Sequence, residues 1–198
     1  MCLVGVPAAM GARPASAQAT GSVRYTVVPE RSEARYRVRE QLVGVTLPND
    51  AVGTTHAVAG AITFDALGGV VSSQSRFTVD LRTLTSDEPR RDNFLRRNTL
   101  QTDRYPLAVF VPTEVRGLQF PLPQTGTATF EMTGDFTIRE TTRRTTWQAS
   151  ATFKGAEVDV RADTAVRFAD LGLEIPRVRV VLSVEDNIRL ELDLGLRR

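Results

Sequence analysis

Hydrophobic and polar residues alternate with a period of two along most of the chain. Between residues 130 and 138, apolar or small side chains are separated by Glu131, Thr133, Asp135 and Thr137. Such a period turns one face of a strand toward water and the other toward a core, as antiparallel sheets require. The same alternation is seen in further segments, namely 58–64, 77–81, 147–153, 158–168 and 188–194.

Short turn sequences separate the expected strands, which favours antiparallel neighbours. Gly68-Gly69 and Pro121-Leu122-Pro123 lie at two of these boundaries. The strands expected at 124–138 and 141–155 are long, which suits a tall, tilted barrel better than a compact sandwich. An open sheet of eight or so strands would expose two edges that closure removes. We therefore expect an all-β fold in which about eight antiparallel strands close into a barrel.

The segment 86–100 interrupts the alternation with four arginines and a modest apolar face. Ser86 or Asp87 is suited to cap the start of a helix, and Pro89 falls within the first turn. We expect a short helix at about 87–98 that lies across one end of the barrel.

The N-terminal residues 1–19 are small and apolar and end in Ala17-Gln18-Ala19, a sequence of the kind that signal peptidase cuts. We expect a signal peptide over 1–19, with its positively charged start truncated, and a single barrel domain over 20–198. The alternative is a disordered, alanine-rich tail. Cleavage would remove Cys2, the only cysteine, which is compatible with a periplasmic or secreted bacterial protein.

Composition excludes several function classes. The net charge of +2, from 25 basic and 23 acidic residues, gives no support for nucleic-acid binding. No run beyond the N-terminus is apolar enough to predict a transmembrane span. His56 is the only histidine, which argues against a histidine-based zinc site and against a catalytic triad elsewhere in the chain. We expect no enzyme activity, although no pair among the many carboxylates can be singled out or dismissed.

One stretch resembles a known family. SRFTVDLRTLTSDEPRRDNFLRRNTLQTDRYPLAVF, residues 75–110, resembles the central signature of the YceI-like family of polyisoprenoid-binding, lipocalin-like proteins. GDFTIRETTRRTTW, residues 134–147, resembles a hairpin of the same family, and the resemblance extends over roughly 24–196. It implies an eight-stranded, lipocalin-like antiparallel barrel with a helix at its mouth. It also implies an exported bacterial carrier of a long isoprenoid chain or another amphiphile.

Three positions depart from the family pattern. Phe94 and Arg31 stand where family members often carry histidines, and Glu140 stands where glycine is usual. If those histidines contact a ligand head group in the family, this chain lacks that contact. The departures therefore favour a different ligand, or none.

An eight-stranded barrel is about the size at which the lumen is either filled by side chains or holds one small ligand. Small residues among the inward positions favour an elongated apolar cavity, whereas for any single residue packing in a filled core is the simpler interpretation. The side chains that we expect to line such a lumen are Phe64, Phe77, Val79, Phe110, Phe130, Met132, Phe136, Trp147, Phe153 and Phe168.

The arginine-rich helix has a candidate role at the mouth of the barrel. Arg91, Arg96 and Arg97, with Asp92, are predicted to face a polar head group through charge-assisted hydrogen bonds. The alternative is that Asp92 pairs with Arg96 and that the other arginines are solvated. Asp92 is expected to tether the helix to the barrel.

The sequence thus predicts a non-enzymatic barrel that carries an isoprenoid or similar amphiphilic lipid in its lumen. No cofactor is expected beyond such an isoprenoid or quinone-like lipid, and a homo-oligomer is compatible with the sequence. A second hypothesis is a filled barrel that works through its surface as a protein-interaction or envelope-stress module. A third is an enzyme that uses carboxylates at the barrel mouth.

Overall fold

The computed structural model describes residues 21–44, 46–178 and 181–198. The signal peptide predicted over 1–19 and its cleavage site lie outside these residues. The strands are β1 (Val23–Leu42), β2 (Asn49–Thr55), β3 (Val58–Phe64), β4 (Arg76–Asp80), β5 (Thr85–Ser86), β6 (Leu107–Arg116), β7 (Thr125–Ile138), β8 (Thr141–Lys154), β9 (Glu157–Val166) and β10 (Val181–Arg197). The helical segments are η1 (Ser72–Gln74), η2 (Leu81–Thr83), α1 (Pro89–Phe94), η3 (Leu95–Thr99) and η4 (Ala169–Leu171).

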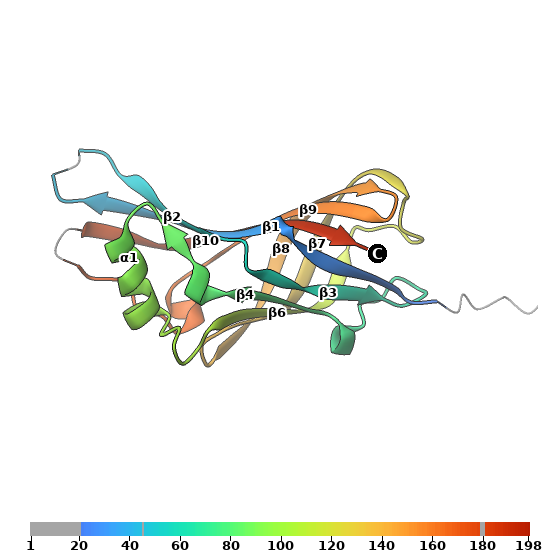
Figure 1. Ribbon diagram of the computed structural model, residues 1–198, viewed down its shortest axis with the longest axis horizontal. Coiled ribbons are helices and arrows are strands. Elements are labelled where there is room, and N and C mark those ends of the chain that lie inside the picture. Colours follow the sequence, from blue (N-terminus) through green and yellow to red (C-terminus); the bar gives the residue numbers. More distant parts are fainter. Residues whose placement is uncertain (1–20, 45, 179–180) are drawn as a thin grey trace, which may run out of the picture.

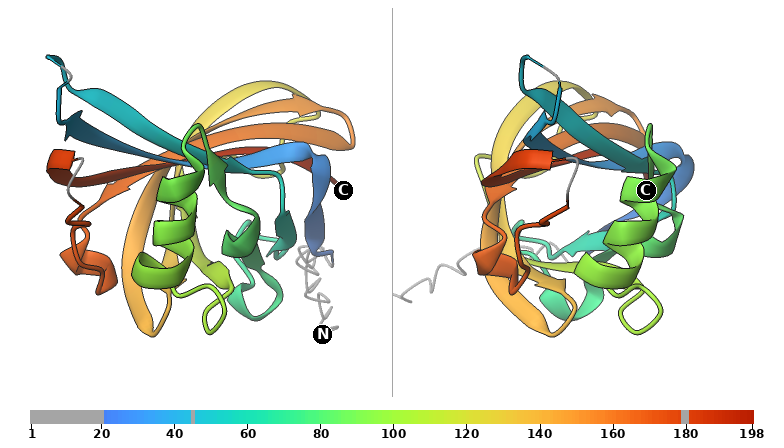
Figure 2. Two further views of the ribbon diagram at one scale, coloured as in Figure 1. Left: turned by 60° about the vertical axis from the view of Figure 1, so that its left-hand side comes forward. Right: turned by 90° about the vertical axis from the view of Figure 1, so that its left-hand side faces the viewer.

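Within the described ranges, eight of the strands form a closed ring in the order β1-β3-β4-β6-β7-β8-β9-β10, and β10 pairs back onto β1. The ring is seen end-on in the right-hand view of Figure 2. Its neighbouring strands are antiparallel, so the predicted eight-stranded antiparallel barrel is confirmed. The long hairpin predicted from the sequence is β7–β8, which is paired from Thr125↔Lys154 to Ile138↔Thr141.

Strand β1 belongs to the ring and also extends beyond it. Its first residues, 23–26, pair with β3, and its residues 34–40 pair with β2. β2 in turn pairs with the short β5. β2 and β5 therefore extend the sheet past the rim of the barrel on the side of α1, as Figure 1 shows. The sequence analysis did not predict this extension.

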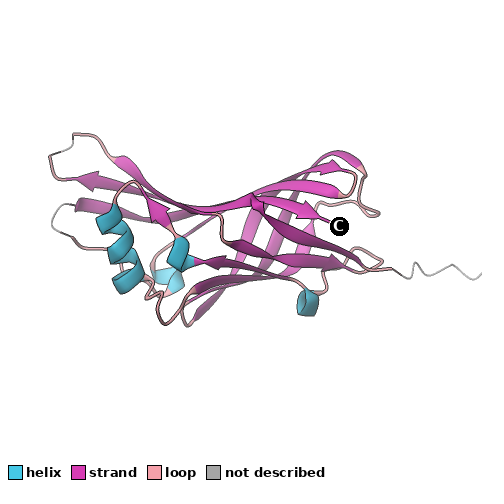
Figure 3. Cartoon of the chain, in the orientation of Figure 1, coloured by secondary structure: helices cyan, strands magenta, loops and turns pink. Residues whose placement is uncertain are grey.

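Helical segments lie at the two ends of the barrel, with α1, η3 and η4 together at one of them (Figure 3). η3 is a single π-helical turn that continues α1 toward Thr99. The capping residue differs from the expectation: Glu88, not Ser86 or Asp87, is the N-cap, and its carboxylate accepts a hydrogen bond from the Arg90 amide. The Ser86 hydroxyl lies two residues earlier in the chain, where it donates to Asp92 and accepts from the Glu88 amide at 3.3 Å.

The barrel interior is built from the alternation seen in the sequence. On β8, the inward side chains from Thr145 to Phe153 are buried at every second position, and the residues between them are mostly exposed. None of the helices in the three described ranges is long and apolar enough to cross a membrane.

Candidate functional site

The barrel half next to α1 and η3 contains an apolar cavity of about 140 Å³. Its wall combines aliphatic and aromatic side chains from most strands of the ring. These include Val58, Phe77, Val79, Ala108, Phe110, Phe136, Ile138, Trp147, Ile188, Leu192 and Leu194. The cavity is therefore formed jointly by the inward faces of several strands.

Segments outside the ring close this cavity at the helix end. η3 contributes Leu95 and Thr99, followed by Leu100, and the chain after β9 contributes Leu171 and Leu173. Leu100 and Leu171 are buried, although both belong to connections between strands. The helix end of the barrel is thus covered by an apolar lid formed from two separate segments.

An aromatic cluster lies on one side of the cavity. The ring of Trp147 meets Phe110 and Phe136 edge-on, with centroid distances of 5.9 and 6.1 Å. Gly134 makes room for this cluster, because a Cβ there would lie 2.8 Å from the ring of Phe110 and 2.3 Å from the carbonyl oxygen of Val111. A side chain at this position would displace the ring or the β6 backbone.

The predicted lumen residues divide into two groups. Phe77, Val79, Phe110, Phe136, Trp147 and Phe168 line the cavity. The other four do not. Phe64, Met132 and Phe153 are buried away from it, where Phe64 packs against Phe120 with ring centroids 5.2 Å apart, and Phe130 is only partly buried. The sequence could not separate the groups, because alternation identifies inward faces and not the part of the barrel that side chains fill.

Arg91 and Asp92 are bound to other parts of the protein. The Arg91 guanidinium donates to the carboxylate of Glu40 at 2.7 Å and to that of Asp87 at 2.6 Å. Asp92 is buried and accepts from the Ser86 hydroxyl at 2.6 Å and from the Ser86 amide at 3.1 Å. These contacts join α1 to β5 and to the end of β1.

Arg96 donates to the carbonyl of Leu84 at 3.0 Å, and Arg97 is exposed. The pairing of Asp92 with Arg96, weighed as an alternative, is replaced by these separate contacts. Among the cavities formed by the described residues, neither the apolar cavity nor the polar depression beside it includes any of the four residues predicted to face a head group. Their role as a head-group site stays a prediction.

The polar depression lies outside the lid and has a volume of about 880 Å³. Thr99 lines both this depression and the apolar cavity, so the two adjoin. The other residues around it are Phe94, Asn98, Gln101, Arg139, Gly172, Glu174, Ile175, Pro176 and Arg177. The sequence analysis missed this group, because its members come from three connections that only the closed fold brings together.

Two residues of the depression have an unusual backbone. Gln101 and Arg139 have φ values of +52° and +53°, in the left-handed region that side chains other than glycine rarely adopt. The Arg139 guanidinium donates to the carbonyl of Thr99 at 3.4 Å. It therefore connects the β7–β8 turn to the end of η3, across the outer side of the lid.

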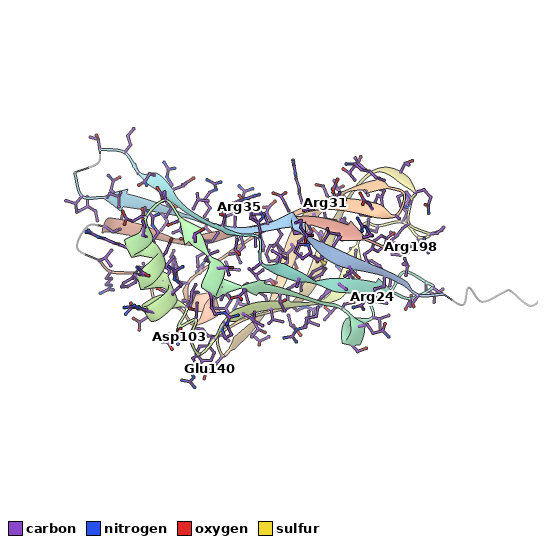
Figure 4. The ribbon with its side chains drawn as sticks, in the orientation of Figure 1. Arg24, Arg31, Arg35, Asp103, Glu140 and Arg198 are labelled. Carbon is purple, nitrogen blue, oxygen red and sulfur yellow. The ribbon has the colours of Figure 1, made fainter. Side chains whose placement is uncertain are left out.

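Charged residues next to the cavity are neutralised locally. Arg35 and Glu191 contribute to its lining, but the Arg35 guanidinium pairs with Glu33, with Glu191 at 3.1 Å and with Asp193 at 2.5 Å. Figure 4 labels both Arg31 and Arg35 along β1. The carboxylates of these partners satisfy the guanidinium, so it is not a free cation for a ligand inside the barrel.

Among the described residues, four buried polar atoms have no hydrogen-bond partner, and three of them are Tyr36 Oη, Thr145 Oγ1 and Trp147 Nε1. Tyr36 and Trp147 line the cavity, and Thr145 lies two residues before Trp147 on the inward face of β8. Burial raises the pKa of Tyr36 to about 12. The hydroxyl of Tyr36 is therefore neutral at physiological pH.

His56 lies at the surface of the protein, away from the apolar cavity. His56 is 71% exposed; its Nδ1 lies 2.9 Å from the carbonyl of Ser32, and its Nε2 lies 3.4 Å from Glu33. Among the residues that the structure describes, no cluster of three or more histidine, cysteine or acidic side chains is placed to hold a metal ion.

A closed antiparallel barrel with a helix-capped apolar interior defines the structural class of this protein. The family model of the YceI-like domain matches residues 25–196. The chain therefore belongs to the YceI-like family, which confirms the resemblance found in the sequence.

Solved structures share the fold. A polyisoprenoid binding domain from Saccharophagus degradans, implicated in plant cell wall breakdown, superposes with a TM-score of 0.66 at 10% identity, over 87% of this chain and 97% of that one. Burkholderia cenocepacia BcnA gives 0.62 at 13% identity over 85% and 98%, and the Campylobacter jejuni YCEI protein gives 0.61 at 16% identity over 80% and 90%. A comparison with curated proteins gave no match.

Proposed function

We propose that this protein binds the apolar part of a long-chain isoprenoid or a similar amphiphilic lipid in the barrel lumen, without catalysing a reaction. The observation that carries the proposal is the apolar cavity behind the helix lid. The description of the Saccharophagus degradans domain as polyisoprenoid binding supports it, through the shared fold. The exposed position of His56 also favours binding over catalysis.

The size of the cavity sets a condition on this function. Its volume of about 140 Å³ is close to that of cavities that accept a benzene-sized molecule, and below the ~300 Å³ at which drug-sized ligand sites begin. A long-chain lipid therefore needs more room than the cavity offers here, and outward movement of the lid would supply it. The polar depression next to Thr99 is then the place for any charged end of the ligand, beside Arg139 and Arg177.

We further propose that the protein acts as a carrier in the periplasm or outside the cell. A signal peptide over residues 1–19 would deliver it there, and the family membership of the chain supports this placement. An interaction module with a permanently filled barrel is the alternative that the experiment below distinguishes.

The test is native mass spectrometry combined with lipid extraction, on protein expressed with export. Ala108 is buried in the cavity wall, so Ala108→Phe fills the lumen, whereas Leu107→Phe changes the exposed neighbour on the same strand. We expect a co-purifying or added polyprenyl lipid to bind wild type and Leu107→Phe with one-to-one stoichiometry and to be lost from Ala108→Phe. Protein that is isolated empty and takes up no polyprenol, polyprenyl phosphate or quinone would refute the proposal.

A further inference from the structure

Trp147 and Thr145 occupy neighbouring inward positions on β8, and each carries a hydrogen-bonding group without a partner among the described residues. Trp147 is 3% exposed and Thr145 is 7% exposed. In the part of the chain that the structure describes, neither the indole Nε1 nor the hydroxyl Oγ1 has a hydrogen-bond partner. In folded proteins, buried polar groups are paired in the large majority of cases, so each exception calls for an explanation.

The immediate neighbours of these groups that the structure describes are apolar or lack a side chain. Trp147 packs edge-on against Phe110 and Phe136, and Thr145 stands opposite Gly134. An indole N–H donates but cannot accept, and a threonine hydroxyl can donate a second hydrogen bond to the same oxygen. The pair is therefore complementary to an acceptor oxygen on a molecule inside the barrel.

The charge of that oxygen follows from the lining. The guanidinium of Arg35 is satisfied by Glu33, Glu191 and Asp193, and the remaining side chains around the cavity are almost entirely apolar. A carboxylate or phosphate in the lumen would find no counter-ion there, and a buried unpaired charge is strongly disfavoured. A neutral oxygen meets no such penalty.

We propose that the part of the ligand inside the lumen carries a neutral acceptor oxygen, such as a carbonyl, which accepts hydrogen bonds from Trp147 Nε1 and Thr145 Oγ1. The inference rests on the proposed function, since it assumes that an apolar ligand enters the lumen. It adds that a pure hydrocarbon chain is a poorer ligand than the same chain with a carbonyl group. Trp147 and Thr145 are then specificity-determining residues.

The test compares two probes of the same carbon skeleton. Geranylacetone is an isoprenoid ketone, and its counterpart carries a methylene group where the ketone has its carbonyl. Because Trp147 is the only tryptophan, its indole N–H gives a single NMR signal that reports directly on the proposed donor. We expect the ketone to bind roughly tenfold more tightly than the hydrocarbon and to move the indole proton downfield.

Three variants test which residues cause the preference for the ketone over the hydrocarbon. Trp147→Phe keeps an aromatic ring without the N–H group, and Thr145→Val keeps the shape without the hydroxyl. Thr146→Val is the matched control, because Thr146 is exposed on the outer face of the same strand. The first two variants should bring the ketone-to-hydrocarbon affinity ratio close to one, and the control should retain the wild-type ratio.

The possible failures are distinguishable. Equal binding of both probes to wild type, or a ratio that Trp147→Phe and Thr145→Val leave unchanged, overturns this inference while the proposed function stands. A water molecule that keeps its contact with the indole proton at saturating ketone also overturns it. If neither probe binds and polyprenyl lipids do not bind either, the proposed function fails first.

Discussion

The side chains of Arg91 and Glu40 form an ion pair that is largely withdrawn from water, with exposed fractions of 17% and 7%. The pair connects the helix to the last residues of β1, at the edge of the lid. The sequence showed that Arg91 belongs to a charged helix but not which residue it meets, because Glu40 lies 51 positions earlier in the chain. The arginines between residues 90 and 97 thus differ in their partners, and we expect them to differ in their contribution to stability.

Arg91→Met tests this difference. The variant leaves the buried Glu40 carboxylate without its cation, so the free energy of unfolding should fall by about 3 kcal/mol. Arg97→Met, at an exposed position of the adjoining segment η3, should change it by no more than about 0.5 kcal/mol. Urea denaturation measures both. A loss for Arg91→Met no larger than that of the control would contradict the stabilising role of the pair.

Tyr36 gives a second prediction at the same scale. Burial raises the pKa of its phenol from about 10 to about 12 in the folded protein. The folded state therefore retains the proton while the unfolded chain loses it, so stability is fully present below about pH 10 and declines toward pH 12.

Tyr36→Phe should remove a part of that decline, on the order of 2 to 3 kcal/mol. Tyr105→Phe is the control, because Tyr105 lies at the surface beside Glu140 and should remove much less. Urea unfolding followed by circular dichroism at several values between pH 9 and pH 12 gives the comparison. An alkaline decline of the same size in wild type and Tyr36→Phe would refute it.

At the scale of elements, the lid differs from the strands that it covers. α1 and η3 hold to the barrel through the apolar contacts of Leu95 and Leu100 and through a few polar contacts, whereas β7 and β8 pair along their whole length. The sequence predicted the helix and its position from its break in alternation. It did not predict the π-helical turn or the Glu88 cap, because several polar residues compete for the same backbone groups.

The lid should therefore open more readily than the barrel unfolds. We expect backbone amides of residues 90–99 to exchange with solvent at least about 100-fold faster than paired amides of β7 and β8, through a local opening. Addition of a bound lipid should slow exchange in the lid more than in the strands. Hydrogen exchange followed by NMR measures both. Equal protection of lid and strands would contradict an opening lid and the entry route proposed here.

At the scale of the molecule, alternation and short turns predicted antiparallel strands that close into a barrel or stack as a sandwich. The length of the strands expected at 124–138 and 141–155 then favoured the barrel, which the structure confirms. Six of the ten predicted lumen residues line the cavity, and the four others are inward residues of the filled part or its margin. The polar depression could not be predicted from the sequence. Arg139, Gly172 and Gln101 become neighbours only when the ring closes.

The most direct test of the account is photo-crosslinking with a diazirine-bearing polyprenyl probe, followed by mass spectrometry of the labelled peptides. The central claim is that an apolar ligand occupies the lumen behind the lid. It predicts labels on inward residues such as Phe77, Phe110 and Trp147, and their loss in Ala108→Phe but not in Leu107→Phe. Labels confined to outward residues, or equal labelling of the filled variant, would contradict the claim.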